Sequence, residues 1–147
     1  MSTPAGGFDL GAVAPVSDLE DEGTAVHLRD IDDELMYFTP DGEKEERPVT
    51  ITVAGSYSKR YRKAQNAHTT RTMKGARRGT RVTGEALQEQ MLDLAATCVI
   101  AWDGFFDAGK ILSCNKENAV RVFQQAPWFL EQVQAAQVDH ASFFGKS

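Results

Sequence analysis

Residues 115–144 read NKENAVRVFQQAPWFLEQVQAAQVDHASFF, and this stretch predicts two short helices that meet at a corner. Asn115 is a good N-cap for the first helix, because its side chain can accept a hydrogen bond from an amide of the first turn. Pro127 fits the first turn of the second helix but not the interior of one longer helix. The polar positions are mostly Gln and Asn, and several apolar positions hold large aromatic residues. The pattern favours packing against other protein over catalysis.

An apolar stripe upstream of this corner predicts another helix over residues 84–102, with Thr83 as its N-cap. Asp103 and Gly104 are expected to end that helix, and a tight turn is expected over residues 107–109. The members of the stripe recur at helical spacing. They are Leu87, Met91, Leu94, Ala95, Cys98, Val99 and Trp102.

Residues 24–54 are typical of strands, because TAVHLRD alternates in polarity, ELMYF is apolar and aromatic, and PVTITVAG is rich in β-branched residues. Residues 39–42 (TPDG) predict a turn between the last two strands. Residues 56–82 then predict a helix that has Ser56 or Ser58 as N-cap and that frays or breaks at its glycines.

Together these segments predict an α+β fold, in which a small N-terminal β-meander or hairpin (about residues 24–55) precedes a C-terminal bundle of three to four helices (about residues 56–144). At 147 residues, one domain is expected, and it is assigned to residues 23–147. Residues 1–22 contain two prolines and end in an acidic run. They are expected to form a flexible acidic arm.

Charge is strongly segregated along the chain, although the net charge is only −5. Residues 1–46 hold 13 acidic and 2 basic residues, whereas residues 59–81 hold nine basic residues and no acid. A basic block with neighbouring tyrosines is typical of a phosphate-binding surface, but the acidic block could instead pair with it, within one chain or between neighbours. The block comprises Lys59, Arg60, Arg62, Lys63, Arg71, Lys74, Arg77, Arg78 and Arg81.

The sequence contains no catalytic or metal-binding motif. Its three histidines lie far apart without ligand spacing, and no nucleophile elbow or phosphate-binding glycine loop occurs. Residues 30–34 could supply an acid and a base, but an exposed acidic edge explains them equally. Cys98 and Cys114 form neither a CxxC pair nor a disulfide framework, which favours a reducing compartment. We expect no enzyme activity, no cofactor or metal, no small-molecule substrate, no signal peptide and no membrane span.

Residues 48–144 resemble the tail assembly chaperones of long-tailed bacteriophages. The shared pattern is an apolar helix ending in Trp, a short Asp–Gly turn, a capped ENA helix, then PW, QV and a terminal aromatic pair. A strand leading into a helix start of the form G-x-x-S-x-x-Y/F also matches. These features occur here at residues 100–104, 115–119, Pro127-Trp128, Gln132-Val133, Phe143-Phe144 and Gly55, Ser58 and Tyr61.

The resemblance implies a non-enzymatic tail morphogenesis factor in the host cell cytoplasm, without a cofactor. Such a protein binds the tape measure protein, tail tube subunits or both. Trp128, Phe129, Phe143 and Phe144 are the candidate protein-binding residues, although Trp128 also fits a core anchor at the helix corner. Truncation after His140 is expected to leave the fold intact and to weaken self-association or client binding.

Two other functions remain open. A structural protein of the virion tail or neck would form a homo-oligomer in which the acidic arm of one subunit pairs with the basic block of its neighbour. A nucleic-acid-associated accessory protein would act through the basic block at residues 59–81, with an affinity that falls steeply as salt rises.

Overall fold

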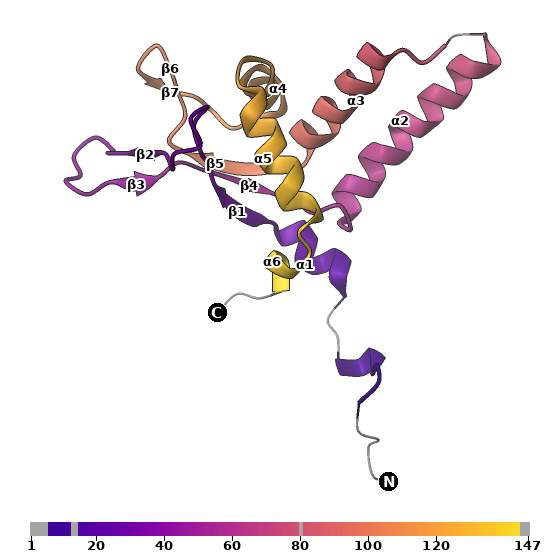
Figure 1. The fold of residues 1–147 in the computed structure, drawn as a ribbon, viewed down its shortest axis with the longest axis horizontal. Helices are drawn as coiled ribbons and strands as arrows, with labels where there is room; N and C mark the ends of the chain where they lie inside the picture. Colours follow the sequence, from indigo (N-terminus) through magenta and orange to yellow (C-terminus); the bar gives the residue numbers. More distant parts are fainter. Residues whose placement is uncertain (1–5, 13–14, 80, 145–147) are drawn as a thin grey trace.

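The computed structural model describes residues 6–12, 15–79 and 81–144. One strand from the second half of the chain, over residues 99–103, pairs with the N-terminal strands in the main sheet, beside the helices (Figure 1). The predicted mixture of N-terminal strands and later helices is confirmed, whereas a separate helical bundle is not. The elements in chain order are η1 (Leu10–Ala12), α1 (Val16–Glu22), β1 (Thr24–His27), β2 (Tyr37–Phe38), β3 (Arg47–Pro48), β4 (Thr50–Val53), α2 (Lys59–Arg77), α3 (Gly84–Thr97), β5 (Val99–Asp103), β6 (Phe106–Asp107), β7 (Lys110–Ile111), α4 (Lys116–Gln125), α5 (Pro127–Val138) and α6 (Ala141–Phe144).

The main sheet is antiparallel with strand order β1-β4-β5, and Ile51 of β4 lies between Val26 of β1 and Trp102 of β5. The prediction of one helix over residues 84–102 is therefore wrong at its end, because α3 stops at Thr97 and the following residues form β5. Over five residues, Val, Ile and Trp suit a strand as well as a helix. Pairing with β4 decides between the two.

The core lies between this sheet and helices α3, α4 and α5. The predicted caps hold, since Thr83 accepts a hydrogen bond from the amide of Ala86 and Asn115 accepts one from that of Asn118. Pro127 occupies the first turn of α5, as expected. The buried apolar residues of the core are Leu28, Val49, Ile51, Val53, Ala54, Ala95, Ala96, Cys98, Phe105, Ala119, Phe123, Phe129 and Val133.

Two short hairpins extend from the sheet, β2–β3 and β6–β7. The turn predicted at residues 39–42 follows β2, and Gly42 has a positive φ of 82°. The turn predicted at residues 107–109 joins β6 to β7, with positive φ at both Ala108 and Gly109, as a tight two-residue hairpin requires.

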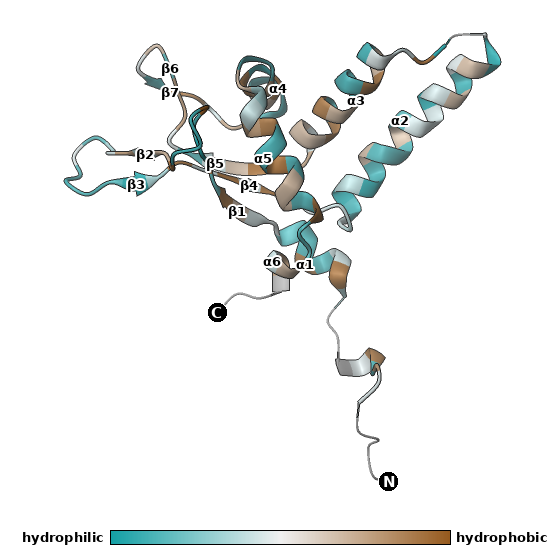
Figure 2. Cartoon of the chain, viewed as in Figure 1, coloured by the Kyte–Doolittle hydropathy of each residue, from teal (hydrophilic) through white to brown (hydrophobic). Residues whose placement is uncertain are grey.

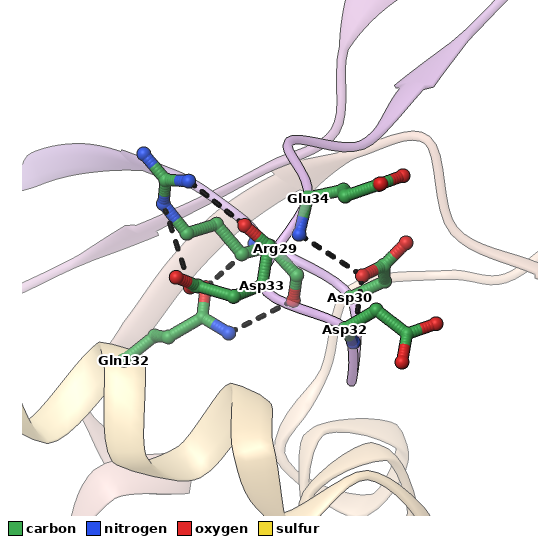
Figure 3. Close-up of polar contacts among 6 residues, drawn as sticks. All are labelled: Arg29, Asp30, Asp32, Asp33, Glu34 and Gln132. Carbon is green, nitrogen blue, oxygen red and sulfur yellow. Dashed lines mark hydrogen bonds and ion pairs between the residues drawn. The ribbon is translucent and has the colours of Figure 1, made fainter.

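The acidic residues that follow β1 form a turn (Figure 3). The Asp30 carboxylate accepts hydrogen bonds from the amides of Asp32 and Glu34, at 2.9 and 3.1 Å. The side chain of Gln132 in α5 forms two hydrogen bonds with the backbone of Arg29. Its Oε1 accepts from the Arg29 amide, and its Nε2 donates to the Arg29 carbonyl. These contacts give the acidic residues a structural role and fix the turn against α5.

The acidic run before β1 forms helix α1, and the Glu20 side chain of that helix is fully buried. Its carboxylate accepts a hydrogen bond from the Tyr57 amide at 2.9 Å and bonds to His140 Nδ1 at 2.7 Å. The Glu20 carbonyl accepts from the Gly55 amide. The expectation of a flexible arm is therefore wrong for residues 16–22, while residues 1–5 and 13–14 lie outside the described part of the chain.

Helix α1 also caps α2. The Asp21 carboxylate accepts hydrogen bonds from the amides of Lys59 and Arg60, each at 3.1 Å, and Ser58 accepts one from the Tyr61 amide. Lys59 forms an ion pair with Asp18 as well. Carboxylates at a helix N-terminus satisfy its unpaired amides and complement its dipole. The acidic run thus folds back onto the start of the basic block, which is one of the two pairings that the charge segregation allows.

The expected break of α2 at Gly75 is wrong, because the helix continues to Arg77. A glycine inside a helix costs about 1 kcal/mol relative to alanine, and a helix of 19 residues tolerates that cost. Gly79, with a φ of 81°, lies just beyond the helix end, where a left-handed residue is favourable.

We expect Glu20→Ala to lower the free energy of unfolding by about 3 kcal/mol, because it leaves the Tyr57 amide and His140 without their buried partner. Urea unfolding followed by circular dichroism measures the change. Glu22→Ala, at an exposed position of the same helix, is the control and should stay within about 0.5 kcal/mol of wild type. Equal stability of the Glu20 and Glu22 variants would contradict the role assigned to Glu20.

Candidate functional site

The aromatic residues predicted to bind protein lie mostly inside the fold. Phe129 is 8% exposed and Phe143 is 4% exposed, so neither offers a binding surface. Trp128 is half-buried and packs against the core, as its alternative role required. Phe144 ends α6, but its side chain lies outside the described part of the structure.

Phe143 is buried because the chain makes room for it at Gly55. A side chain at Gly55 would collide with both Phe143 and Glu20, so α6 closes over the turn that leads into α2. The expectation that truncation after His140 leaves the fold intact is therefore corrected. Truncation there removes a buried side chain, which costs stability directly.

A helical hairpin formed by α2 and α3 projects from the sheet (Figure 1). Helix α2 buries none of its residues and is mostly hydrophilic (Figure 2), and α3 buries only Ala95 and Ala96. Two polar contacts join the helices, His68 to Asp93 at 2.8 Å and Gln90 to Thr72 at 3.2 Å. The hairpin is hollow on both sides of this line of contacts.

The first hollow, the neutral groove, consists of two adjoining cavities of about 410 and 220 Å³. Leu87 and Met91 of α3 are 50% and 54% exposed there, and Met73 of α2 and Val138 of α5 are exposed as well. No Asp, Glu, Lys or Arg lines the groove. Its lining comprises Tyr61, Gln65, His68, Thr69, Thr72, Met73, Leu87, Gln90, Met91, Leu94, Ala95, Gln134, Gln137 and Val138.

The groove explains what becomes of the apolar stripe predicted over α3. Ala95 is buried and Leu94 is partly buried at the groove, whereas Met91 and Leu87, one and two turns closer to the helix start, are exposed in it. Helix α2 lines the same cavity with Gln65, Thr69 and Thr72 and with three larger side chains, Tyr61, His68 and Met73. Two turns of an apolar helix face are thus left partly in water, which indicates a contact surface for another molecule.

The second hollow, the basic cleft, has a volume of about 690 Å³. It shares only His68 with the neutral groove, so it opens on the other side of α2. Three residues of the predicted basic block, Arg60, Lys63 and Arg71, line the cleft. Lys116 of α4 lines it as well. The remaining members of the basic block lie outside the cleft and are exposed. They are Lys59, Arg62, Lys74, Arg77, Arg78 and Arg81.

Asp93 is the one carboxylate among the residues that line the cleft, and it joins three helices. Its oxygens lie 2.8 Å from His68 Nε2 of α2 and 2.9 Å from Lys116 Nζ of α4. Partial burial alone would raise the pKa of Asp93, but the hydrogen bonds from Lys116 and His68 outweigh burial and place the pKa below its ordinary value of 3.8. Asp93 is therefore ionised near neutral pH, and its carboxylate pairs with Lys116 and His68.

The buried cysteine and the three histidines take part in packing or hydrogen bonds within the fold. Burial raises the pKa of the Cys98 thiol to about 11, which keeps the thiol protonated near neutral pH. His27 bonds to the Met36 carbonyl, and His68 and His140 bond to carboxylates. Among the described residues, no cluster of three or more His, Cys, Asp or Glu side chains could hold a metal ion, and no helix is long and apolar enough to cross a membrane.

Neither a protein-family model, nor a curated protein, nor a solved structure was found to match the chain. The two hollows of the hairpin are therefore the observations from which a function can be argued.

We expect Asp93→Asn to lower the free energy of unfolding by about 1 kcal/mol at neutral pH, through loss of two charge-assisted contacts. Because the folded pKa of Asp93 lies below the unfolded value, its contribution is present above pH 3.8 and is lost as the pH falls through the folded pKa. The difference between variant and wild type in urea unfolding should therefore shrink as the solution is acidified. Asp32→Asn, at an exposed carboxylate, should differ little from wild type throughout. A difference for Asp93→Asn that grows with acidity would contradict this account.

Proposed function

We propose that the protein is a non-enzymatic assembly factor that binds an amphipathic helix of a partner protein in the neutral groove. The half-exposed pair Leu87 and Met91 on the projecting hairpin is the observation that carries the proposal. Burying a leucine or methionine side chain contributes about 1.5–3 kcal/mol, so a partner that covers this pair gains substantial binding free energy.

The lining of the groove favours a helix as the bound element. Leu87, Met91 and Leu94 are spaced at i, i+4 and i+7, so they form a ridge on one face of α3. An apolar helix face packs against such a ridge, and methionine side chains adapt to partners of differing shape. The remaining lining is mostly Gln and Thr, which can hydrogen-bond at the rim without requiring a charged partner.

The resemblance to phage tail assembly chaperones suggests which partner this is. A tape measure protein is a long helical chain with apolar seams, and tail tube subunits are the second partner that the resemblance implies. A chain of that kind presents many amphipathic segments, each of which could occupy the groove in turn. On this proposal the hairpin shields apolar seams of the client during tail assembly, and the C-terminal aromatics hold the body together.

The test is to co-express the protein with a phage tape measure protein and to measure their association by pull-down and by titration with peptides tiled along that client. We expect Leu87→Glu with Met91→Glu to weaken binding at least tenfold, which corresponds to about 1.4 kcal/mol. Both positions are half-exposed on a helix, and glutamate is a good helix former, so the variant should keep its circular dichroism spectrum and unfolding midpoint.

Ile111→Glu is the matched control, because Ile111 is 84% exposed and lies on the β6–β7 hairpin. It should leave binding unchanged. Equal binding by the groove variant and wild type would refute the groove as the site. Failure of every client segment to bind the wild-type protein would refute the function itself.

A further inference from the structure

Part of the acidic block folds back onto the start of α2, but another part projects away from it (Figure 1). The loop between β2 and β3, residues 41–46, carries four acids and one lysine and is exposed along its whole length; we name it the acidic loop. It lies at one end of the longest axis of the molecule, and the tip of the α2–α3 hairpin lies at the other (Figure 1). The basic cleft begins at the base of this hairpin, where Val99 and Lys116 line it, and the acidic loop projects from the far side of the sheet (Figure 1).

At both places, some charged side chains form no ion pair with another described residue. In the acidic loop, Glu43 pairs with Arg47 at 3.6 Å, whereas Glu45 and Glu46 form no ion pair with any described residue. In the basic cleft, Lys63 and Arg71 likewise form no ion pair within the described part of the chain. The other two cations of the cleft are engaged, because Arg60 donates to the Val99 carbonyl and Lys116 pairs with Asp93. Two acids and two bases without an ion-pair partner among the described residues are thus available, the acids in the loop and the bases in the cleft.

We propose that the acidic loop of one copy docks in the basic cleft of a second copy, so that the protein associates head to tail. The contact joins two different surfaces, so it is heterologous, and repetition produces a ring or an open filament rather than a closed dimer. The cleft, at about 690 Å³, holds several side chains, and the acidic loop is a narrow projection at the end of a hairpin. This contact uses the opposite side of α2 from the neutral groove and does not depend on the proposed client.

A second copy fits the cleft better than a nucleic acid does. The chain has a net charge of −5, and Asp18 and Asp21 lie beside the first turn of α2. A long phosphate backbone would meet these carboxylates as it ran past the cleft, whereas a short acidic loop ends within it. The complementary loop is also present at the same concentration as the cleft in every solution of the protein.

The proposal is tested by reversing the charges of the cleft and of the loop in separate variants and measuring association by sedimentation velocity at low salt. We expect wild type to associate with concentration, and this association to weaken at least fivefold between roughly 50 and 500 mM salt, where the screening length falls below about 5 Å. The cleft variant Lys63→Glu with Arg71→Glu and the loop variant Glu45→Lys with Glu46→Lys should each lose association alone. Mixed in equal amounts, they should form complexes again, because each then supplies the complement of the other.

Arg77→Glu with Arg78→Glu is the matched control, since it reverses the same number of charges at the tip of the hairpin outside the cleft. It should retain association. All of the substituted side chains are exposed, so circular dichroism should show native spectra. A wild-type protein that stays monomeric at low salt, or variants whose mixture does not associate, would overturn the proposal.

A fluorescent single-stranded DNA oligonucleotide, added to the same proteins, tests whether the cleft binds a nucleic acid instead of a second copy. Binding of the oligonucleotide by wild type and by the loop variant but not by the cleft variant, without self-association of wild type, would assign the cleft to phosphate instead of to a second copy.

Discussion

The buried carboxylate of Glu20 is the constraint on which the rest of the structure depends. A charged group in a protein interior is costly unless hydrogen bonds satisfy it, and Glu20 obtains them from the Tyr57 amide and from His140. One side chain thereby joins the N-terminal helix, the turn into α2 and the C-terminal corner. Because Asp21 and Ser58 cap α2 beside this point, the same contacts fix the direction in which the hairpin leaves the sheet.

The molecule divides into a body built on the main sheet and a projecting helical hairpin. In the described residues of the body, the sheet and helices α4 and α5 enclose an apolar core, and no buried side-chain nitrogen or oxygen lacks a partner. The hairpin instead keeps hollows on both sides of α2, one neutral and one basic. The residues of the two hollows are thus mostly separate from the residues that hold the fold, which lets the hairpin surfaces vary without loss of the body.

Local features could be predicted from the sequence, and long-range ones could not. Asn115, Thr83 and Pro127 were placed correctly because capping and the first-turn preference of proline depend only on neighbouring residues. Strand β5, the burial of Glu20 and the burial of Phe143 depend on partners more than 35 positions away, and nothing local signals them. The neutral groove had a usable signal. An apolar stripe on α3 beside a polar α2 indicates a face that the chain itself does not cover.

Amide hydrogen exchange, followed residue by residue with and without the helical client, tests the division between body and hairpin most directly. The account predicts slow exchange in β4, β5 and α5 of the isolated protein and fast exchange in the distal half of α2, since few buried contacts hold that half. Addition of the client should slow exchange in α2 and α3 and leave the sheet unchanged. Protection of distal α2 equal to that of β4 in the isolated protein would contradict the account, because the hairpin would then need no partner to complete it.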